Sequence, residues 1–469
     1  MFKLNQVPFF LILFFLLGHT SVSQNKTEVL APEITFQEFL ALVKQHHPII
    51  KQANLKLSLA EAKLLKARGA FDPIIEADLS QKDFEGTNYY DKLSTAFKIP
   101  TWFGIELKGS FEENSGTYLN PENKVPIDGL YAAGVSLPLA KNLLTNDRMA
   151  TLKMAKFFIK QSQAERIITI NTILYEATKA YLDWFQAENE KEIYKNAIDN
   201  ANERYNAIIK TIKLGQVAAI DSVEAKINLQ SRKLAYEAAK LTLAKSKLYA
   251  SNFIWIQDIP LELEANVVPV LPQFEEFYMD LPVVSLENIA LDKHPKLVYY
   301  DYKIESMAVD VSLKKNNLLP TIDLAYNFIT SGNNQFDAFN TQDYKAGLYF
   351  KLPLFLRKER GDLKISQAQL KDSQFERDNQ EVMLKNKIEA VNYEIKSLSV
   401  QKEIIRNMVS NYSLLLKAEE RIFFIGESSL FLINSREQKL IEGQLKEIEL
   451  IVKELDALAS RRNILATYN

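Results

Sequence analysis

The sequence predicts a mainly α-helical fold that also carries a small number of β-strands and is built from two tandem repeats. Two very long runs without proline, residues 139–259 and 354–469, indicate helices of unusual length. Short segments with alternating polarity precede each run and indicate strands. A His-Pro dipeptide opens this pattern in both halves, and such a recurrence indicates a duplication.

The bulk composition excludes several classes of protein. The chain of 469 residues has 47% hydrophobic and 25% charged side chains, as expected for a folded protein. Its net charge of -2 argues against a nucleic-acid binder that depends on a positive field. It has no cysteine, which excludes disulfides, thiolate metal sites and a cysteine nucleophile.

Residues 1–23 have the features of a secretory signal peptide. An apolar core at residues 7–17 is followed by Ser21 and Ser23, which fit a cleavage site before Gln24. This core is shorter than the roughly 20 residues that a transmembrane helix needs, and the alternative is a buried N-terminal helix. Since no other segment is apolar enough to cross a membrane as a helix, we expect an exported protein whose membrane spans are strands.

The two halves of the chain share one order of elements. The dipeptide at residues 47–48 recurs at 294–295, and Pro73 recurs as Pro320, both 247 residues later. Each pair of motifs brackets a helical segment of equal length, and a β-rich segment ending in Leu-Pro-Leu follows in both halves. The resulting division has a first repeat at residues 24–255, a linker at 256–285 and a second repeat at 286–469.

Heptad spacing indicates that the long helices lie in coiled coils. Apolar residues are spaced by alternating steps of three and four at residues 194–208 and again at 388–398. Helices from about 145 to 214 and from about 359 to 425 would each be roughly 100 Å long. Helices of that length need neighbours along their whole extent, either in the same chain or in a partner.

Strand-like segments occupy residues 74–138 in the first half and 320–353 in the second. They end near aromatic residues, a pattern that suits an outer-membrane barrel and also a soluble sandwich. Because about eight strands is the smallest number that closes a useful barrel, several copies would have to share one. The first strand region is 32 residues longer than the second, and residues 98–129 could form an added hairpin and a long loop.

A glycine interrupts each long helical run. Gly215 is the only glycine between Pro138 and Pro260, and Gly426 is its counterpart in the second half. A glycine inside a helix costs roughly 1 kcal/mol relative to alanine, whereas at a helix C-terminus it adopts the left-handed conformation with little strain. We therefore predict that each run consists of two antiparallel helices joined at its glycine.

These features together resemble the TolC family of trimeric outer-membrane channel proteins. The resemblance covers about residues 33–469 and rests on the paired His-Pro segments, the paired strand ends and the paired glycines. It implies a homotrimer in the bacterial outer membrane, with four strands from each chain in a shared twelve-stranded β-barrel. It also implies a long periplasmic α-barrel of coiled-coil helices. Residues 98–129 depart from this pattern and put the strand count in question.

The resemblance also implies a set of functional residues. In the family, the glycine turns lie at the periplasmic tip and meet an adaptor protein. The corresponding residues here are Gly215, Gln216, Val217, Gly426, Glu427 and Ser428. Family members often carry acidic residues six and nine positions after such a glycine, where they narrow the pore entrance. Asp221 and Glu224 occupy these positions in the first repeat, but Leu432 and Ser435 do so in the second. The alternative is that Asp221 caps the start of a helix.

No motif indicates an enzyme. Phosphate-binding, dinucleotide-binding and zinc-protease motifs are absent from the sequence, so we expect neither a catalytic site nor a cofactor. His46, His47 and His294 invite a metal site, but the latter two precede proline, which favours a role at helix ends. The resemblance implies a passive exit duct of an efflux or type I secretion system, with a periplasmic adaptor and an inner-membrane pump as partners. The alternative is a periplasmic coiled-coil scaffold without a pore.

Overall fold

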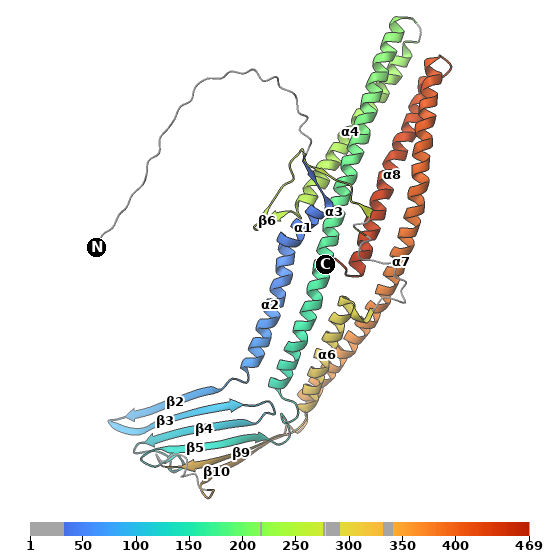
Figure 1. Ribbon diagram of the computed structural model, residues 1–469. Helices are drawn as coiled ribbons and strands as arrows, with labels where there is room; N and C mark the ends of the chain where they lie inside the picture. Colours follow the sequence, from blue (N-terminus) through green and yellow to red (C-terminus); the bar gives the residue numbers. More distant parts are fainter. Residues whose placement is uncertain (1–31, 216–217, 275–276, 278–290, 332–340, 469) are drawn as a thin grey trace, which may run out of the picture.

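The protein is an elongated stack of helices with a sheet at one end and two helical turns at the other (Figure 1). The computed structural model describes residues 32–215, 218–274, 277, 291–331 and 341–468. The predicted signal peptide and part of the predicted linker therefore lie outside the described residues. No helix within the described part of the chain combines the length and the apolar character needed to cross a membrane.

Two antiparallel pairs of long helices form the body of the stack. Helix α3 (Asp147–Lys213) packs against α4 (Ile220–Ser251), and α7 (Arg357–Phe424) packs against α8 (Leu430–Ile464). The 67 residues of α3 and the 68 residues of α7 each extend roughly 100 Å. The mainly helical fold with long coiled-coil pairs is thus confirmed.

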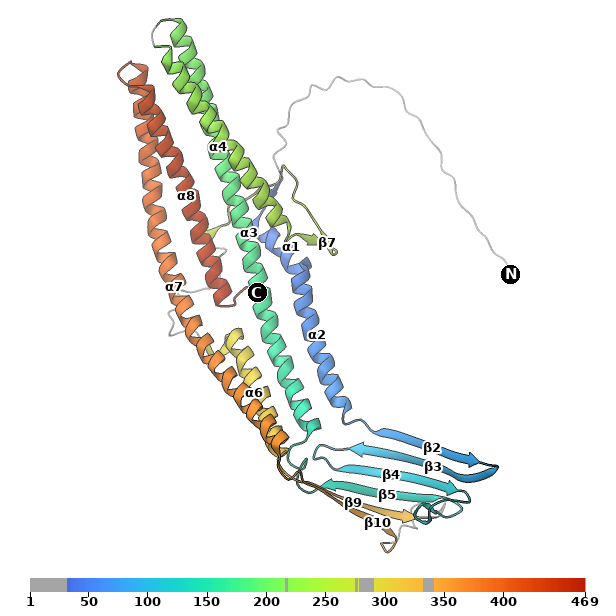
Figure 2. The same cartoon turned by 180° about the vertical axis from the view of Figure 1, so that it is seen from behind.

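Two shorter helices complete the half of the stack nearest the sheet. Helix α2 (Pro48–Gly69) packs against α3, and α6 (Pro295–Asn316) packs between α3 and α7. The order across the stack is α2–α3–α6–α7 near the sheet and α4–α3–α8–α7 near the turns (Figures 1 and 2). Helices α2 and α4 therefore form one lateral edge of the chain, and α7 forms the other.

Histidine side chains start α2 and α6 in the same way. The Nδ1 atom of His47 accepts a hydrogen bond from the backbone N–H of Ile49 at 3.3 Å. His294 Nδ1 accepts from the N–H of Lys296 at 3.1 Å, and its Nε2 lies 2.8 Å from the carbonyl oxygen of Ile464. Both rings are buried. The structure thus places both histidines at helix ends, as their position before proline predicts.

The sheet has six antiparallel strands in the order β10-β9-β5-β4-β3-β2. Its strands are β2 (Ile74–Phe84), β3 (Thr87–Pro100), β4 (Glu106–Ser115), β5 (Leu130–Pro138), β9 (Thr321–Thr330) and β10 (Tyr344–Lys351). The first repeat supplies four strands and the second supplies two. The chain thus has six strands in this sheet where the resemblance to the TolC family implies four, and residues 98–129, which depart from the family pattern, include β4 and its flanking turns.

The two repeats share a core around the middle of α3. The hydroxyl of Tyr181 lies 2.8 Å from the carbonyl oxygen of Ile34 and 2.7 Å from that of Val270. It thereby holds the short parallel strands β1 (Glu33–Ile34) and β8 (Val268–Pro269) against α3. The remaining elements of this belt are α1 (Phe36–His46), β6 (Trp255–Ile256) and β7 (Ile259–Pro260). This belt fixes the linker region between the repeats to the long helices.

Candidate functional site

The six-stranded sheet has one apolar face and one polar face. The strand register places one exposed apolar side chain from each strand on the same face, namely Leu79, Phe97, Leu107, Val135, Leu324 and Leu348. The opposite face carries polar residues in every strand, among them Asp78, Lys98, Lys108, Ser136, Asp323 and Lys345. An exposed apolar surface that covers a whole sheet needs a partner surface or lipid to cover it.

Aromatic side chains mark both ends of the sheet. At the end away from the helices, the rings of Phe111 and Tyr131 lie 4.8 Å apart, and those of Tyr326 and Tyr344 lie 5.3 Å apart. At the helical end, Trp102 stacks on Phe71 with 5.7 Å between ring centroids. Trp102 and Phe71 also pack against Ala67, Leu152 and Ala155 of the helices. Aromatic residues at the ends of an apolar sheet face are typical of strands that cross a bilayer.

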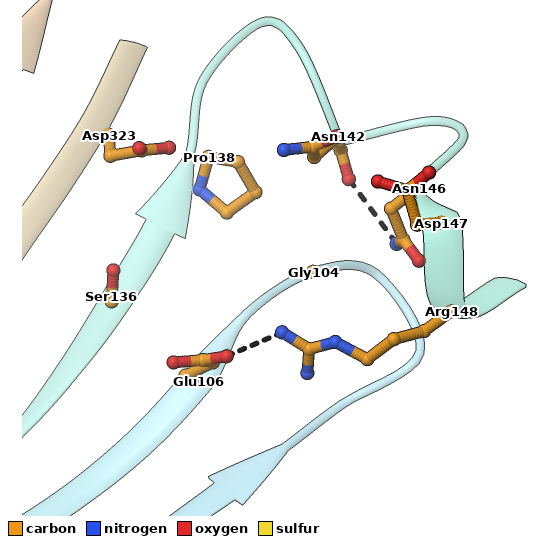
Figure 3. A pocket seen from close by; sticks show the side chains of 9 residues that line it. All are labelled: Gly104, Glu106, Ser136, Pro138, Asn142, Asn146, Asp147, Arg148 and Asp323. Carbon is orange, nitrogen blue, oxygen red and sulfur yellow. Dashed lines mark hydrogen bonds and ion pairs between the residues drawn. The ribbon is translucent and has the colours of Figure 1, made fainter. Parts of the chain in front are cut away.

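The polar face of the sheet continues into a cavity of about 260 Å³ at the start of α3 (Figure 3). Arg148 donates to the Glu106 carboxylate at 2.5 Å and so connects α3 to β4. Asn146 caps α3, since its Oδ1 accepts from the Met149 N–H at 2.9 Å. Its amide nitrogen donates to the carbonyl oxygen of Trp102 at 3.0 Å. These contacts fix the angle between the sheet and the long helices.

The long helices turn at the two predicted glycines. Gly215 has φ 71° and Gly426 has φ 86°, so both adopt the left-handed conformation. After α7, the N–H of Gly426 donates to Phe423 O at 3.0 Å, and that of Glu427 donates to Ile422 O at 3.1 Å. This is the bond pattern of a Schellman C-cap. No atom lies within 4 Å of a Cβ built at either glycine, so both turns face open space.

Apolar side chains surround both turns. The exposed fraction is 90% for Phe424 and 69% for Phe431 at the second turn, and 72% for Leu214 at the first. Sequence reasoning did not select these residues, although phenylalanines on both sides of Gly426 were a visible signal. Of the predicted tip residues, Glu427 and Ser428 follow Gly426 in the turn, and the Ser428 hydroxyl donates to Glu419. Gln216 and Val217 lie outside the described residues.

The two predicted carboxylates lie in the first turns of α4. The N-cap of α4 is Ala219, whose side chain makes no capping bond, and Asp221 lies within the helix. The alternative of Asp221 as the cap is therefore wrong. The Glu224 carboxylate accepts a hydrogen bond from the Asn434 amide of α8 at 3.2 Å. Glu224 thus faces the other helix pair.

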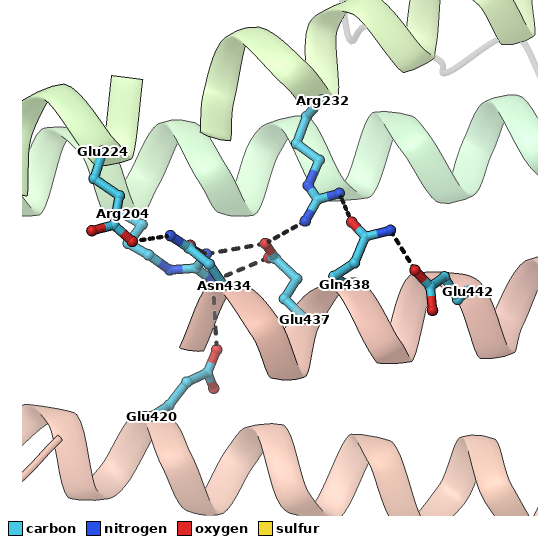
Figure 4. A network of polar contacts seen from close by, with 8 residues as sticks. All are labelled: Arg204, Glu224, Arg232, Glu420, Asn434, Glu437, Gln438 and Glu442. Carbon is cyan, nitrogen blue, oxygen red and sulfur yellow. Dashed lines mark hydrogen bonds and ion pairs between the residues drawn. The ribbon is translucent and has the colours of Figure 1, made fainter. Parts of the chain in front are cut away.

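A buried polar network joins the two helix pairs near the turns (Figure 4). At its centre is the Glu437 carboxylate of α8, which is 2% exposed. Arg204 of α3 donates to both Glu437 oxygens at 3.1 Å, and Arg232 of α4 lies 3.6 Å away. Arg232 also donates to Gln438 at 2.5 Å. Nothing in the sequence indicates that Glu437 becomes a neighbour of Arg204 and Arg232, which lie more than 200 positions earlier, so this network could not be predicted.

Comparison with known proteins gives matches to solved structures. No protein-family model and no curated protein matches the sequence. The Campylobacter jejuni CmeC outer membrane channel matches with a TM-score of 0.67 and 15% identity, over 92% of this chain and 85% of that one. The open state of the Neisseria gonorrhoeae MtrE outer membrane channel matches with a TM-score of 0.66 and 13% identity, over 92% and 88%.

A third match is the outer membrane protein VceC from Vibrio cholerae, with a TM-score of 0.64 and 13% identity over 92% of this chain and 95% of that one. The chain has the fold of these outer-membrane channels. The fold that the resemblance to the TolC family implies is therefore confirmed. At this level of identity the likeness concerns the fold alone.

In this channel fold, one lateral edge of the chain presents an apolar stripe that we call the α4 stripe. It consists of Ile220, Ile227, Leu234, Leu241 and Leu248, which are seven residues apart and 68%, 61%, 75%, 57% and 54% exposed. A heptad row of exposed apolar residues is typical of a helix that lacks its coiled-coil partner. The opposite edge, α7, also presents apolar side chains, among them Tyr393 and Val400, which are 72% and 62% exposed.

Proposed function

We propose that this protein is a passive exit duct of the bacterial outer membrane. The observation that carries the proposal is the sheet with one apolar and one polar face, joined to helices roughly 100 Å long in the fold of outer-membrane channels. The apolar face would meet lipid hydrocarbon, and the polar face would line a water-filled lumen. A long periplasmic extension would then follow from the helices, which leave the sheet at one end.

We further propose that the duct is a homotrimer. Six strands are too few to close a barrel, so several copies must contribute to one wall. The two lateral edges of the chain differ, and unlike edges that meet head to tail close into a ring. In such a ring, the α4 stripe of one copy would pack against the exposed apolar side chains of α7 in the next. The number three comes from the resemblance to the TolC family.

The helical turns are the proposed docking site for a periplasmic adaptor, which in turn joins an inner-membrane pump. The docking residues are Gly215, Gln216, Val217, Gly426, Glu427 and Ser428. Support comes from the open space around both glycines and from the exposed apolar side chains beside them. An exposed apolar tip on a soluble helix pair indicates a protein partner. The system would serve efflux or type I secretion, and the duct itself needs no catalytic residue.

Asp221 and Glu224 are the proposed carboxylates of the pore aperture. Three copies would bring six carboxylates to the tip of the helical barrel, and such a ring favours cations. The double variant Asp221→Asn/Glu224→Gln should reduce the cation preference of the open channel, measured as a reversal potential in a salt gradient. Glu237→Gln removes one charge from the same helix farther from the turn and is the control. An unchanged reversal potential in the double variant would exclude the aperture role.

Membrane fractionation and conductance test the proposal as a whole. We expect heat-labile trimers in the outer-membrane fraction and discrete conductance steps when the purified protein is added to planar bilayers. A periplasmic coiled-coil scaffold, the second candidate, would be recovered as a soluble protein and would not conduct. The exposed apolar face of the sheet favours the channel, because a scaffold surrounded by water has no use for it.

A further inference from the structure

We propose that the barrel of this protein has eighteen strands, six from each of three copies, and that β2 of one copy pairs with β10 of the next. This inference rests on the proposed trimeric channel. It adds the strand number, the position of the seam and the width of the pore. Its starting point is the hairpin of β3 and β4, which separates this chain from the four-strand pattern.

The added hairpin is part of the wall. Strand β3 pairs with β2 on one side and with β4 on the other, and β4 pairs with β5. The ladder between β3 and β4 extends from Asp91–Ser115 to Pro100–Glu106 without a break. A hairpin that occupied the lumen or lay outside the barrel would have no such place in the middle of a sheet. Removing it from the wall would separate β2 from every strand it contacts.

The side chains of the hairpin follow the same alternation as the rest of the wall. Phe97 of β3 and Leu107 of β4 lie on the apolar face, and both are exposed in the single chain. Their neighbours Lys98 and Lys108 face each other on the polar side. Charged residues of these two strands on the apolar face, Asp91 and Glu113, lie only toward the loop end. The hairpin is therefore built to lie between lipid and water, as the other four strands are.

The sheet ends in two edges that suit each other in direction. Strand β2 follows α2 and leads away from the helices, whereas β10 leads back to them and into α7. With an even number of strands per chain, β10 of one copy and β2 of the next are antiparallel. Closure therefore continues the antiparallel ladder without an additional strand.

Both edges are exposed and need a partner. Every residue of β10 is exposed, as is every residue of β2 except Ser80. Leu79 is 73% exposed and Leu348 is 68% exposed, so each edge also presents large apolar side chains. A long apolar edge with free backbone groups is a hazard for aggregation unless another strand covers it.

Charge complementarity identifies the partner of each edge as a second copy of the chain. On the polar face, β2 carries Glu76 and Asp78 and, toward its loop end, Lys82, whereas β10 carries Lys345 and Lys351. Glu76 contacts Lys98 of its own chain at 2.6 Å, and no ion pair within the described residues involves Asp78, Lys345 or Lys351. Opposite charges across neighbouring strands stabilise a pair, and like charges destabilise it. A β2–β10 seam is therefore favoured over β2–β2 or β10–β10 contacts.

Eighteen strands would give a wide pore. Barrel diameter grows roughly linearly with strand number, so three copies of six strands give a barrel about 1.5 times as wide as one of twelve strands. Barrels of 16–18 strands leave an aqueous channel. The extracellular end of this duct would therefore pass bulkier or hydrated cargo, and the narrow point would lie elsewhere, at the helical tips.

Cysteine cross-linking tests the seam, because the chain has no cysteine of its own. Ala77→Cys in β2 is combined in turn with Ala346→Cys, Gly347→Cys and Leu348→Cys in β10, and membranes are oxidised. We expect one register to give covalent dimers and trimers on a non-reducing gel, with no larger species. A gel on which the largest cross-linked species is a dimer, or the absence of any cross-link, would overturn the proposal.

A control pair distinguishes eighteen strands from twelve. Ala77→Cys combined with Ala133→Cys of β5 joins positions that β3 and β4 keep apart in the proposed wall. We expect no cross-link from this pair. An intramolecular cross-link would show that β2 and β5 are neighbours and that the hairpin is outside the wall.

Labelling of single cysteines separates this proposal from the proposed function. In β3, Ser94→Cys should react with a membrane-impermeant maleimide, and Thr95→Cys should be protected by lipid. In β9, Ala325→Cys and Leu324→Cys should behave in the same way whether the wall has twelve strands or eighteen. If maleimide labelling alternates between neighbouring positions in β9 but not in β3, the proposed strand number alone is overturned. The absence of alternation in both strands would overturn the channel as well.

Discussion

The two repeats of this protein have nearly identical helices and different strands. Helices α2 and α6 each have 22 residues, and α3 and α7 have 67 and 68. The first repeat nevertheless supplies four strands to the six-stranded sheet, and the second supplies two. Helices of a coiled coil must match their neighbours along their whole length, whereas an antiparallel sheet accepts an additional hairpin without disturbing its ends. The coiled coil therefore restricts the length of its helices, whereas the sheet does not restrict the number of its strands.

The two turns differ in chemistry although Gly215 and Gly426 both adopt the left-handed conformation. The first is followed by the carboxylates Asp221 and Glu224, and the second is flanked by Phe424 and Phe431. Helix α8 begins with a side-chain cap from Ser429, whereas α4 begins at Ala219 without one. The two halves of the chain thus share a glycine turn and differ in its surface, so we expect variants at equivalent positions of the two halves to behave differently.

The largest effect is expected at the contact that binds the repeats together. Glu437→Ala would leave Arg204 and Arg232 without the buried carboxylate that they share. Removing one partner of a buried ion pair costs about 3–5 kcal/mol, so the protein should unfold at a clearly lower temperature in detergent. Glu442→Ala removes a carboxylate that is 47% exposed at the end of the same network and should change stability by less than about 0.5 kcal/mol. Equal effects of the two variants would show that the network does not join the repeats.

The glycine turns come next in expected effect. Gly215→Ala or Gly426→Ala places a Cβ on a left-handed residue, which costs about 1–2 kcal/mol, whereas asparagine tolerates this conformation better. If the turns are the proposed docking site, the double variant Gly215→Trp/Gly426→Trp should leave the protein in the membrane but abolish export by blocking the proposed adaptor, measured as dye retention in cells that depend on this protein. The matched Asn/Asn variant should retain export. Normal export by the Trp/Trp variant would show that the turns are not the docking site.

Much of this architecture could be predicted from the sequence, for reasons that are local. Helix ends at His47 and His294 and the turns at Gly215 and Gly426 depend on residues close to one another in the chain. The strand number of the first repeat was open, because alternation over short segments does not distinguish a strand from a loop. The Arg204–Glu437 contact and the α4 stripe depend on which helices become neighbours. Only the folded chain determines that.

The paired residues His47 and His294 should have a smaller effect on stability, and this effect should depend on pH. Burial lowers the pKa of His47 and of His294, because the charged ring is disfavoured away from water. The unfolded chain therefore binds more protons below a pH of about 6.5, and stability falls as the pH decreases through the interval between the unfolded and folded pKa values. Asparagine keeps a capping acceptor but does not titrate in this range.

We expect the melting temperature of the wild type to fall more between about pH 7.5 and pH 5 than that of the His47→Asn/His294→Asn variant. Each single variant should remove part of the difference, since the two rings lie in separate repeats. A pH dependence that is unchanged in the double variant would assign the acid sensitivity to groups other than these two histidines. The buried carboxyls Asp183 and Asp456 are not such groups, because burial raises their pKa values and so makes the folded state bind protons more readily on acidification.

The smallest expected effect concerns the starts of the two return helices. Ser429 has extended backbone geometry, with φ −117° and ψ 154°, and its hydroxyl accepts from the Leu432 N–H at 3.4 Å. Ser429→Ala should therefore cost about 1 kcal/mol. Ala219 has φ −58° and ψ −27°, which is helical geometry and does not direct a hydroxyl toward the free N–H groups. Ala219→Ser should consequently gain less than about 0.5 kcal/mol, measured by thermal unfolding. If Ala219→Ser stabilised the protein as much as Ser429→Ala destabilised it, the side chain alone would explain the asymmetry, and the backbone of the first turn would have to rearrange to accept the new cap.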